Sequence, residues 1–338
     1  MDIRTVDPAR PEETGFPGAY AVFREAVLAD RPWATAPSAD EVLAHLQHED
    51  PTEKSQWFAA FDGDRVVGSG HIFFPLQDNV QMAFLGVCVA PADRRQGIGT
   101  AIARHLLGYA EQQGRTLALG GITVPPGAAD DHPHRAFYRS LGFEFVITEI
   151  VRHLRLPVAD DLLTSLLDDA KTHFRDAYTI ETYTDGVPDD LLPSYCAANN
   201  KLATDAPSGS IDFEEMSLTP DVYRSSLEVN RRLGDVRITA LALTTDREVA
   251  AYTDLNLPAS NPDRAHQWGT LVTAAHRGHR LGTAVKVANL QELQRSHPER
   301  QIVVTDNADT NRYMVSINEA LGFEIVELSE MVKREVSA

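Results

Sequence analysis

The pattern of apolar and polar positions predicts a strand, a loop and a helix in succession between residues 80 and 114. Residues 80–90 (VQMAFLGVCVA) form a mainly apolar run with the length of a buried strand. The loop that follows, residues 91–97, contains two arginines and a glycine. Beyond it, apolar residues recur at nearly helical spacing: Ile98, Ile102, Leu106 and Tyr109. Gly114 is a typical helix stop.

The rest of the first half alternates between strand-like and helix-like segments. Strands are expected at 2–6, 56–62, 65–74, 115–124 and 143–156. Helices are expected at 19–28, at 39–48 and in a short stretch that ends at Leu141. Ser38 is a typical N-cap, and Gly63-Asp64 is a typical hairpin turn. This mixture predicts an α/β fold with a twisted, mixed, mostly antiparallel sheet flanked by helices.

Two motifs of the first half recur in the second half. RRQGIGTAI at 94–102 aligns with RGHRLGTAV at 277–285, and FYRSLGFEFV at 137–146 aligns with INEALGFEIV at 317–326. The offsets, 277 − 94 = 183 and 317 − 137 = 180, are far longer than a solenoid repeat. The chain therefore reads as a duplicated domain.

The second half repeats the order of elements. Strands are expected at 178–183, 236–257 (a hairpin), 267–274, 301–307 and 323–328, with helices at 191–202, 220–233, 281 onward and 310–321. Residues 157–175 are expected to form a linker helix with leucines on one face, or else an edge helix of either half. The predicted domains are thus 1–156 and 176–338, joined by 157–175.

Composition places the chain among globular proteins. It has 338 residues, of which 43% are hydrophobic and 24% charged. The longest mainly apolar run falls short of the roughly 20 residues that a membrane span needs. The first ten residues lack the features of a secretory signal, so a cytoplasmic location is expected. Two cysteines, Cys88 and Cys196, are too few for a disulfide framework.

The net charge of −18 argues against nucleic acid as a partner, because phosphate binding needs a broad cationic surface. An acidic protein attracts cations, so a cationic small molecule suits the field, although the charge could equally serve solubility. No membrane partner and no metal are expected. The oligomeric state is not predicted.

The loop before the first-half helix has the chemistry of an anion site. A helix N-terminus carries unpaired amides and partial positive charge, and the glycines Gly97 and Gly99 would let a phosphate reach them. Arg94 and Arg95 add charge. A Walker A loop is excluded because no lysine accompanies Gly99, and a dinucleotide fingerprint is excluded because Ile102 is not glycine. An ordinary strand-to-helix turn is the alternative.

The two motifs together resemble the GNAT-type N-acetyltransferase superfamily. They are R-x-x-G-x-G, with Arg94, Gly97 and Gly99, and A-F-Y-x-x-x-G-F at 136–143. The duplication resembles that of tandem family members. The resemblance covers nearly the whole chain, and it implies two tandem GNAT-like domains and acetyl-CoA as cosubstrate.

By this resemblance, a set of first-half residues would hold acetyl-CoA. The pyrophosphate would meet the amides of Gln96, Gly97, Ile98, Gly99 and Thr100, near Arg94 and Arg95. The pantetheine arm would pair with Val87, Cys88 and Val89. Tyr138 would protonate the departing thiolate, its alternative role being a core aromatic.

The second half departs from the family pattern. Its corresponding residues are Leu271, Val272, Arg277, Gly278, His279, Arg280, Leu281, Gly282 and Thr283. Arg280 replaces the glycine aligned with Gly97, and Asn318 stands where the first half has Tyr138. Asn311 matches the asparagine that often meets the cofactor arm, whereas the first half has Asp131 there. Cofactor binding is still expected in this half, but a tyrosine acid is absent.

The expected activity is transfer of an acetyl group from acetyl-CoA to a primary amine of a small molecule. The first half is the favoured catalytic half, because it keeps both glycines and the tyrosine; the reverse assignment stays open. The base that deprotonates the amine is not identified, and weak candidates are His71, Asp131, His132, Asp254 and His266. A non-catalytic acyl-CoA sensor and a protein or peptide N-acetyltransferase are the alternatives.

Overall fold

The computed structural model describes residues 1–336, so the last two residues of the expected C-terminal domain, 337–338, lie outside the described residues. The chain forms two compact units. The first comprises residues 1–148 and the end of the chain from Leu328, and the second comprises residues 149–327. Each unit is an α/β structure with a mixed, mostly antiparallel sheet, which confirms the predicted fold class.

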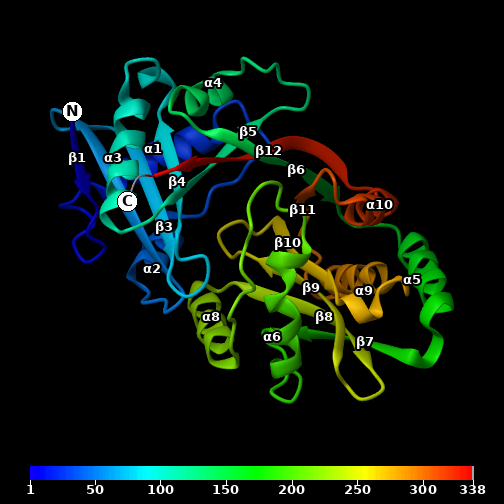
Figure 1. Cartoon of the computed structure of the whole chain (residues 1–338). Coiled ribbons are helices and arrows are strands. Elements are labelled where there is room, and N and C mark those ends of the chain that lie inside the picture. Colours follow the sequence, from blue (N-terminus) through cyan, green and yellow to red (C-terminus); the bar gives the residue numbers. More distant parts are fainter. Residues whose placement is uncertain (337–338) are drawn as a thin grey trace. The chain divides into compact units, whose positions relative to one another are not determined.

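The first unit builds its sheet in the order β1-β2-β3-β4-β5-β12, in which only β4 and β5 run parallel (Figure 1). Its elements are β1 (Asp2–Thr5), α1 (Phe16–Leu28), α2 (Ala39–Gln47), β2 (Glu53–Asp62), β3 (Arg65–Pro75), β4 (Met82–Val89), η1 (Pro91–Asp93), α3 (Ile98–Gln112), β5 (Leu117–Val124), α4 (Pro133–Ser140), the start of β6 (Glu144–Arg155) and the end of β12 (Glu324–Glu335). Ser38 caps α2 with a complete capping box, as predicted.

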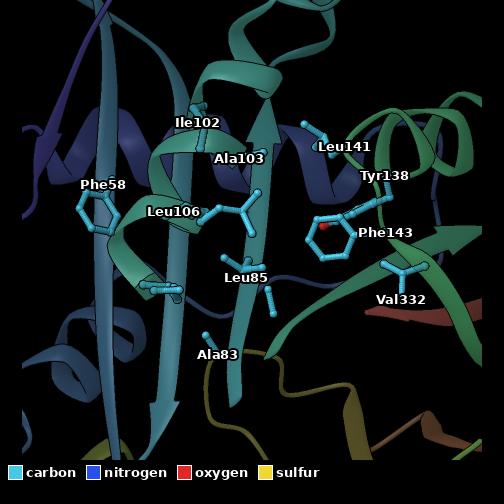
Figure 2. Packing of buried hydrophobic residues seen from close by; sticks show 14 of the residues in the cluster. Phe58, Ala83, Leu85, Ile102, Ala103, Leu106, Tyr138, Leu141, Phe143 and Val332 are labelled. Atoms are coloured by element: carbon cyan, nitrogen blue, oxygen red, sulfur yellow. The ribbon is translucent and has the colours of Figure 1, made fainter. Parts of the chain in front are cut away.

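Helix α3 lies directly on the sheet of the first unit. A Cβ on Gly68 or Gly70 of β3 would come within 2.4 or 2.7 Å of the Ile102 side chain, so these glycines let the helix approach. Figure 2 shows Ile102, Ala103 and Leu106 of α3 facing the strands, with Leu85 of β4 beneath them. Helix α1 covers the other face, where Phe23 contacts the Trp57 ring at 5.1 Å.

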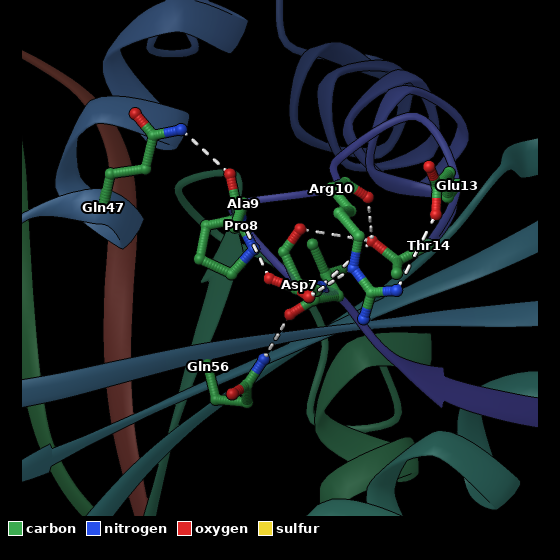
Figure 3. A network of polar contacts seen from close by, with 9 residues as sticks. Asp7, Pro8, Ala9, Arg10, Glu13, Thr14, Gln47 and Gln56 are labelled. Atoms are coloured by element: carbon green, nitrogen blue, oxygen red, sulfur yellow. Dashed lines mark hydrogen bonds and ion pairs between the residues drawn. The ribbon is translucent and has the colours of Figure 1, made fainter.

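A polar network holds the loop between β1 and α1 (Figure 3). The Asp7 carboxylate accepts hydrogen bonds from the Ala9 amide at 2.9 Å and from Arg10 Nε at 3.0 Å. These bonds, the backbone one first, lower the pKa of Asp7. The Asp7 amide in turn donates to Thr14 Oγ1 at 3.0 Å, which leads the chain into α1.

The second unit has the strand order β6-β11-β10-β9-β8-β7, with only β10 and β11 parallel. Its elements are the end of β6, α5 (Asp160–Phe174), η2 (Arg175–Ala177), β7 (Tyr178–Thr184), α6 (Leu192–Asn200), α7 (Leu202–Asp205), α8 (Pro220–Leu233), β8 (Val236–Thr244), β9 (Val249–Leu257), β10 (Arg264–Val272), η3 (Ala274–His276), α9 (Leu281–Ser296), β11 (Ile302–Ala308), α10 (Arg312–Leu321) and the start of β12. The two units therefore repeat the same order of elements.

The expected linker helix is a covering helix of the second unit. Leu163, Ala170 and Phe174 on one face of α5 are buried, and they join the apolar clusters around α9. Residues 160–174 therefore pack within the second unit. This arrangement matches the second of the two expectations for this segment, an edge helix of one half.

The last strand of each half crosses into the other sheet. Residues 328–335 of β12 pair with β5, from Leu328 opposite Val124 to Glu335 opposite Leu117. Residues 149–155 of β6 pair instead with β11. The unit boundaries therefore differ from the predicted 1–156 and 176–338. The two final strands follow nearly identical LGFE motifs, so the sequence pattern does not tell which sheet each one joins.

The predicted end of the last strand at Leu328 is wrong, because β12 continues to Glu335. Residues 329–335 are mostly polar, so the sequence pattern does not indicate a strand there. One of these polar residues has a structural partner. Glu330, which is 5% exposed, accepts hydrogen bonds from Arg135 of α4, with Nε to Oε2 at 2.9 Å. Nη1 of Arg135 also donates to the carbonyls of Ala128 and Ala129 at 2.8 and 2.9 Å. The exchanged strand therefore anchors α4 and the loop before it.

Replacing Glu330 with Gln should destabilise the first unit by about 2–3 kcal/mol, because the partly buried Arg135 guanidinium loses its charged acceptor. Urea unfolding followed by amide exchange in β5 and β12 measures the loss. Glu228→Gln, which breaks an exposed pair with Arg231, is the control and should cost at most about 1 kcal/mol. Equal losses in the two variants would contradict the anchoring role.

Candidate functional site

The parallel strands β4 and β5 separate halfway along their length. They pair from Met82 opposite Leu117 to Leu85 opposite Gly120. Beyond this point β4 still pairs with β3 as far as Val89, but within residues 1–336 it has no further partner in β5. One edge of Val87–Val89 is thus left outside the sheet ladder. An extended ligand can pair with such an edge as a strand would.

Directly after β4, the loop at residues 94–97 leads into α3. Arg95 and Gly97 both have a left-handed backbone, with φ of 67° and 83°. Gly97 is the N-cap of α3 and would have nothing within 4 Å of an added Cβ. Among the described residues no side chain caps this helix, so its first amides remain open toward an anion. Arg94 is committed elsewhere, since its Nε donates to the Val89 carbonyl at 3.3 Å.

Gly99 lies against neighbouring side chains. A Cβ at this position would lie 3.3 Å from the Phe137 ring and 3.6 Å from Val89. Its small size therefore brings α3, α4 and β4 together at the end of the strand pair. Of the two glycines predicted to admit a phosphate, Gly97 is the one next to open space.

Tyr138 lies where β4 and β5 separate. A Cβ on Gly120, the last β5 residue paired with β4, would be 2.4 Å from the tyrosine ring. Figure 2 shows Tyr138 beside Phe143, and their ring centroids are 5.1 Å apart. Burial raises the pKa of Tyr138, and the nearby Cys88 raises it further. Within residues 1–336 no group hydrogen-bonds to the hydroxyl. A protonated donor is thus held free at this point.

Burial also raises the pKa of the Cys88 thiol to about 12, against an opposing effect of Arg94. The pKa of Cys196 rises to about 11 for the same main reason. Both thiols stay protonated near neutral pH, which leaves neither with the character of a nucleophile.

The second unit repeats this geometry. Strands β10 and β11 pair only from Arg264 opposite Ile302 to His266 opposite Val304, although β10 runs on to Val272. Gly278 and Arg280 have φ of 86° and 55°, at the positions that match Arg95 and Gly97. Arg277 Nε donates to the Val272 carbonyl at 3.3 Å, as Arg94 does to Val89. The two loops share a backbone conformation although the glycine has changed position.

The first unit also matches a family by sequence. Residues 20–143 match the model described as the acetyltransferase (GNAT) family. A tandem GNAT protein from the clavulanic acid biosynthesis pathway, solved without acetyl-CoA, is similar over 100% of this chain and 99% of its own, with a TM-score of 0.77 and 25% identity. Residues 20–143 thus carry a GNAT domain, and the whole chain is similar to a tandem GNAT protein.

A second solved structure has a similar fold. A GCN5-related N-acetyltransferase from Sphaerobacter thermophilus is similar over 100% of this chain and 96% of its own, with a TM-score of 0.66 and 15% identity. No curated protein matches the sequence significantly. Family membership supports acyl-CoA-dependent N-acetyl transfer in general terms, and GNAT proteins generally use acetyl-CoA.

In the second unit, two arginines of the corresponding loop already form ion pairs with carboxylates. Arg280 forms an ion pair with Asp169 of α5, and Arg277 pairs with Asp205 at 2.9 Å. His279 packs against Tyr178, with ring centroids 5.6 Å apart. A phosphate at this loop would have to compete with two carboxylates for the arginines, whereas no ion pair engages Arg94 or Arg95 among the described residues.

Asn318, which stands where the first unit has Tyr138, is part of a buried polar network. Its Oδ1 accepts a hydrogen bond from Lys286 Nζ at 2.7 Å, and its Nδ2 donates to Asn307 Oδ1 at 3.0 Å. Arg152 donates to the same Asn307 oxygen at 3.0 Å. The side chains of Lys286, Asn318 and Arg152 are at most 2% exposed. In the second unit, amide and basic side chains thus occupy the position at which the first unit has the Tyr138 hydroxyl.

Sequence reasoning missed this network, although Lys286 stands between Val285 and Val287 in an otherwise apolar stretch of helix. A lysine in such a position signals a buried partner. Asn311, for which a cofactor contact is predicted, is the N-cap of α10, where its side chain accepts from the Met314 amide at 3.2 Å.

The candidate bases differ in whether hydrogen bonds within the protein already occupy their side chains. His132 caps α4 by accepting from the His134 amide, and Asp131 is exposed. Asp254 accepts hydrogen bonds from Tyr195, at 2.7 Å, and from Thr239. His266 also has an interaction partner. His71 is the remaining candidate.

No group of three or more His, Cys, Asp or Glu side chains in residues 1–336 is arranged to hold a metal ion. None of the helices described there is both long and apolar enough to cross a membrane.

Burial and the nearby Arg152 lower the pKa of Lys286 from its ordinary 10.5 to about 7. Between these values the unfolded chain binds the proton and the folded chain does not, so this lysine makes the free energy of unfolding rise with pH. From pH 7 to pH 9, the advantage of wild type over Lys286→Met should therefore grow by about 2 kcal/mol. Urea titrations at both pH values test this. Lys171→Met, which removes a lysine that is 54% exposed, is the control, and its free energy of unfolding should change with pH as that of wild type does. The same pH dependence in Lys286→Met and wild type would contradict the prediction.

Proposed function

We propose that the first unit transfers an acetyl group from acetyl-CoA to a primary amine of a small molecule. The observation that carries this proposal is the separation of β4 from β5 at Leu85 and Gly120, with the free hydroxyl of Tyr138 beside it. The second support is the uncapped start of α3, where Gly97 is open to solvent. A donor, a strand edge and an anion site thus lie along one path.

These residues fit acetyl-CoA in their chemistry. The amides of Gln96, Gly97, Ile98, Gly99 and Thr100 would hold the pyrophosphate, with Arg95 adding charge. The free edge of Val87–Val89 would pair with the amide groups of the pantetheine arm. When bound, acetyl-CoA supplies the activated thioester; the amine nitrogen bonds to its carbonyl carbon, and the C–S bond breaks.

Tyr138 acts on the sulfur in this proposal. Its hydroxyl would donate a hydrogen bond to the thiolate as the C–S bond breaks, and would share its proton with it. A phenol is a weaker acid than a thiol, so the proton is transferred only as negative charge develops. Burial keeps the tyrosine protonated beforehand, since its pKa is raised.

We assign the chemistry to the first unit because the second lacks the donor. Asn318 is engaged on both sides of its amide by Lys286 and Asn307. The pair between Arg280 and Asp169 places a carboxylate near the second anion site. The second unit then serves as scaffold and as donor of strand β12 to the first sheet.

The acceptor class follows from charge. With a net charge of −18, the protein attracts cations, and most primary amines are cationic at neutral pH. We propose a small-molecule amine as partner rather than nucleic acid, and a cytoplasmic site of action.

Gly97→Asp should weaken acetyl-CoA binding at least about ten-fold relative to Gly97→Asn, because only the aspartate repels the pyrophosphate. The two side chains are nearly the same shape, and both tolerate the left-handed backbone, so the pair isolates charge. Isothermal calorimetry with acetyl-CoA gives both affinities. Matching affinities would place the cofactor elsewhere.

Tyr138→Phe should lower kcat about 10²-fold while the KM for acetyl-CoA changes little, because the hydroxyl acts chiefly on the leaving thiolate. Thiol release is measured with glucosamine, spermidine, L-lysine and a peptide with a free N-terminus. Tyr109→Phe in α3 is the control. An unchanged kcat in Tyr138→Phe would move the chemistry away from this residue.

The wild-type panel also separates the alternatives. Thiol release with the peptide alone would make the protein a peptide N-acetyltransferase. Acetyl-CoA binding without release above background for any amine would make it a sensor.

A further inference from the structure

His71 occupies the strand position next to the point where β4 and β5 separate. It lies in β3, directly opposite Gly86 of β4. Gly86 is the first β4 residue beyond the last pair with β5, which is Leu85 opposite Gly120. The histidine is therefore one residue away from the start of the unpaired strand edge.

The imidazole ring lies across β4 over Gly86. A Cβ on Gly86 would be only 2.0 Å from Cε1 and Nε2 of His71, so any other residue there would displace the ring. Trp57 stacks on the imidazole with centroids 5.5 Å apart, and Phe23 meets it edge-on at 5.9 Å. Glycine below and aromatic rings around it fix the direction of the Nε2 edge.

His71 and Tyr138 lie on opposite faces of the sheet. Directly paired residues share a face, and successive residues of a strand alternate between faces. The Cβ direction of Gly120 points at Tyr138, so its partner Leu85 shares the tyrosine face. Gly86, the next residue, points the other way and meets His71. A thioester held where the strands separate would thus have the phenol on one side and the imidazole on the other.

Neither ring nitrogen of His71 is used by the fold. Nδ1 is buried without a hydrogen-bond partner, and no group in residues 1–336 bonds to Nε2. Desolvation lowers the pKa of His71 to about 4, so the ring is neutral near pH 7 and one nitrogen carries a free lone pair. A neutral imidazole packed this tightly, with no structural hydrogen bond, is available to a ligand.

We propose that His71 is a catalytic residue that accepts the proton of the acceptor amine on the sheet face opposite Tyr138. This inference rests on the proposed acetyl transfer. The acceptor ammonium first loses one proton to water, and the neutral amine nitrogen then bonds to the thioester carbonyl carbon and passes a second proton to Nε2. The C–S bond breaks, and the sulfur takes the Tyr138 proton. The imidazolium then loses its proton to water, and the phenolate regains one from water.

The two faces also set the direction of approach. The α3 side of the strand pair carries Tyr138 and Ile98 at the start of α3, whereas His71 lies on the α1 side with Phe23. The acceptor therefore enters from the α1 side, and the two substrates meet where β4 leaves β5.

His71→Ala tests the role, with His105→Ala as the matched control. His105 is a histidine of the same unit that packs on an aromatic ring, Phe58, at 4.8 Å, and its Nε2 also lacks a partner. His71→Ala should lower kcat with the amine panel about 10²-fold, with acetyl-CoA affinity by calorimetry nearly unchanged. Added imidazole should restore part of the lost rate, because the substitution leaves room beside Gly86. His105→Ala should lose little activity and should not respond to imidazole.

The outcomes separate this inference from the proposed function. If wild type releases thiol with an amine but His71→Ala behaves like His105→Ala, His71 has no catalytic role. A rate loss in His71→Ala that follows acetyl-CoA affinity or thermal stability, without imidazole rescue, also overturns it and leaves a packing role. If wild type releases no thiol with any amine, the acetyl transfer itself fails.

Discussion

The early end of pairing between β4 and β5 is the constraint on which the site depends. Parallel strands normally stay paired over their shared length, and here the ladder stops after four residue pairs. The unpaired amides and carbonyls of β4 beyond that point require partners, which the fold does not provide from β5. Gly120 and Gly86, at the end of the ladder, admit Tyr138 from one face and His71 from the other. One interruption in a sheet thereby produces a place for an extended ligand and for two side chains that can move protons.

The duplication shows how much chemistry a common backbone leaves undecided. Both units end the parallel ladder early, tie an arginine to the end of the strand, and place two left-handed residues before the helix. The first unit leaves that helix start open, whereas the second engages its arginines with Asp169 and Asp205. The same strand end holds a free phenol in one unit and a buried network around Lys286 in the other. Function therefore follows from the side chains at a few positions rather than from the fold.

The sequence predicted the fold class, the duplication and most of the elements, because periodicity and caps such as Ser38 act locally. It also pointed to Gly97 and Tyr138 through two separate motifs, but it could not supply the geometry that relates them. The features that the sequence did not predict depend on contacts between residues far apart in the chain. Glu330 reads as a polar residue beyond a strand until Arg135, 195 positions away in the chain, is seen to cover it. Nothing in the local sequence shows that the small size of Gly99 also makes room for Phe137. Neither contact leaves a trace in local spacing.

The exchanged strand has a consequence for biosynthesis. Strand β5 is made early, yet its partner in the ladder, residues 328–335, is made roughly 200 residues later. The first sheet thus has an exposed edge until those residues are made, and closing it requires a contact across roughly 200 residues, which slows folding. An unpaired edge of this kind attracts other strands. The nascent first half must either wait in a partly formed state or pair with a substitute strand, so chaperone demand and aggregation should peak before residues 328–335 are made.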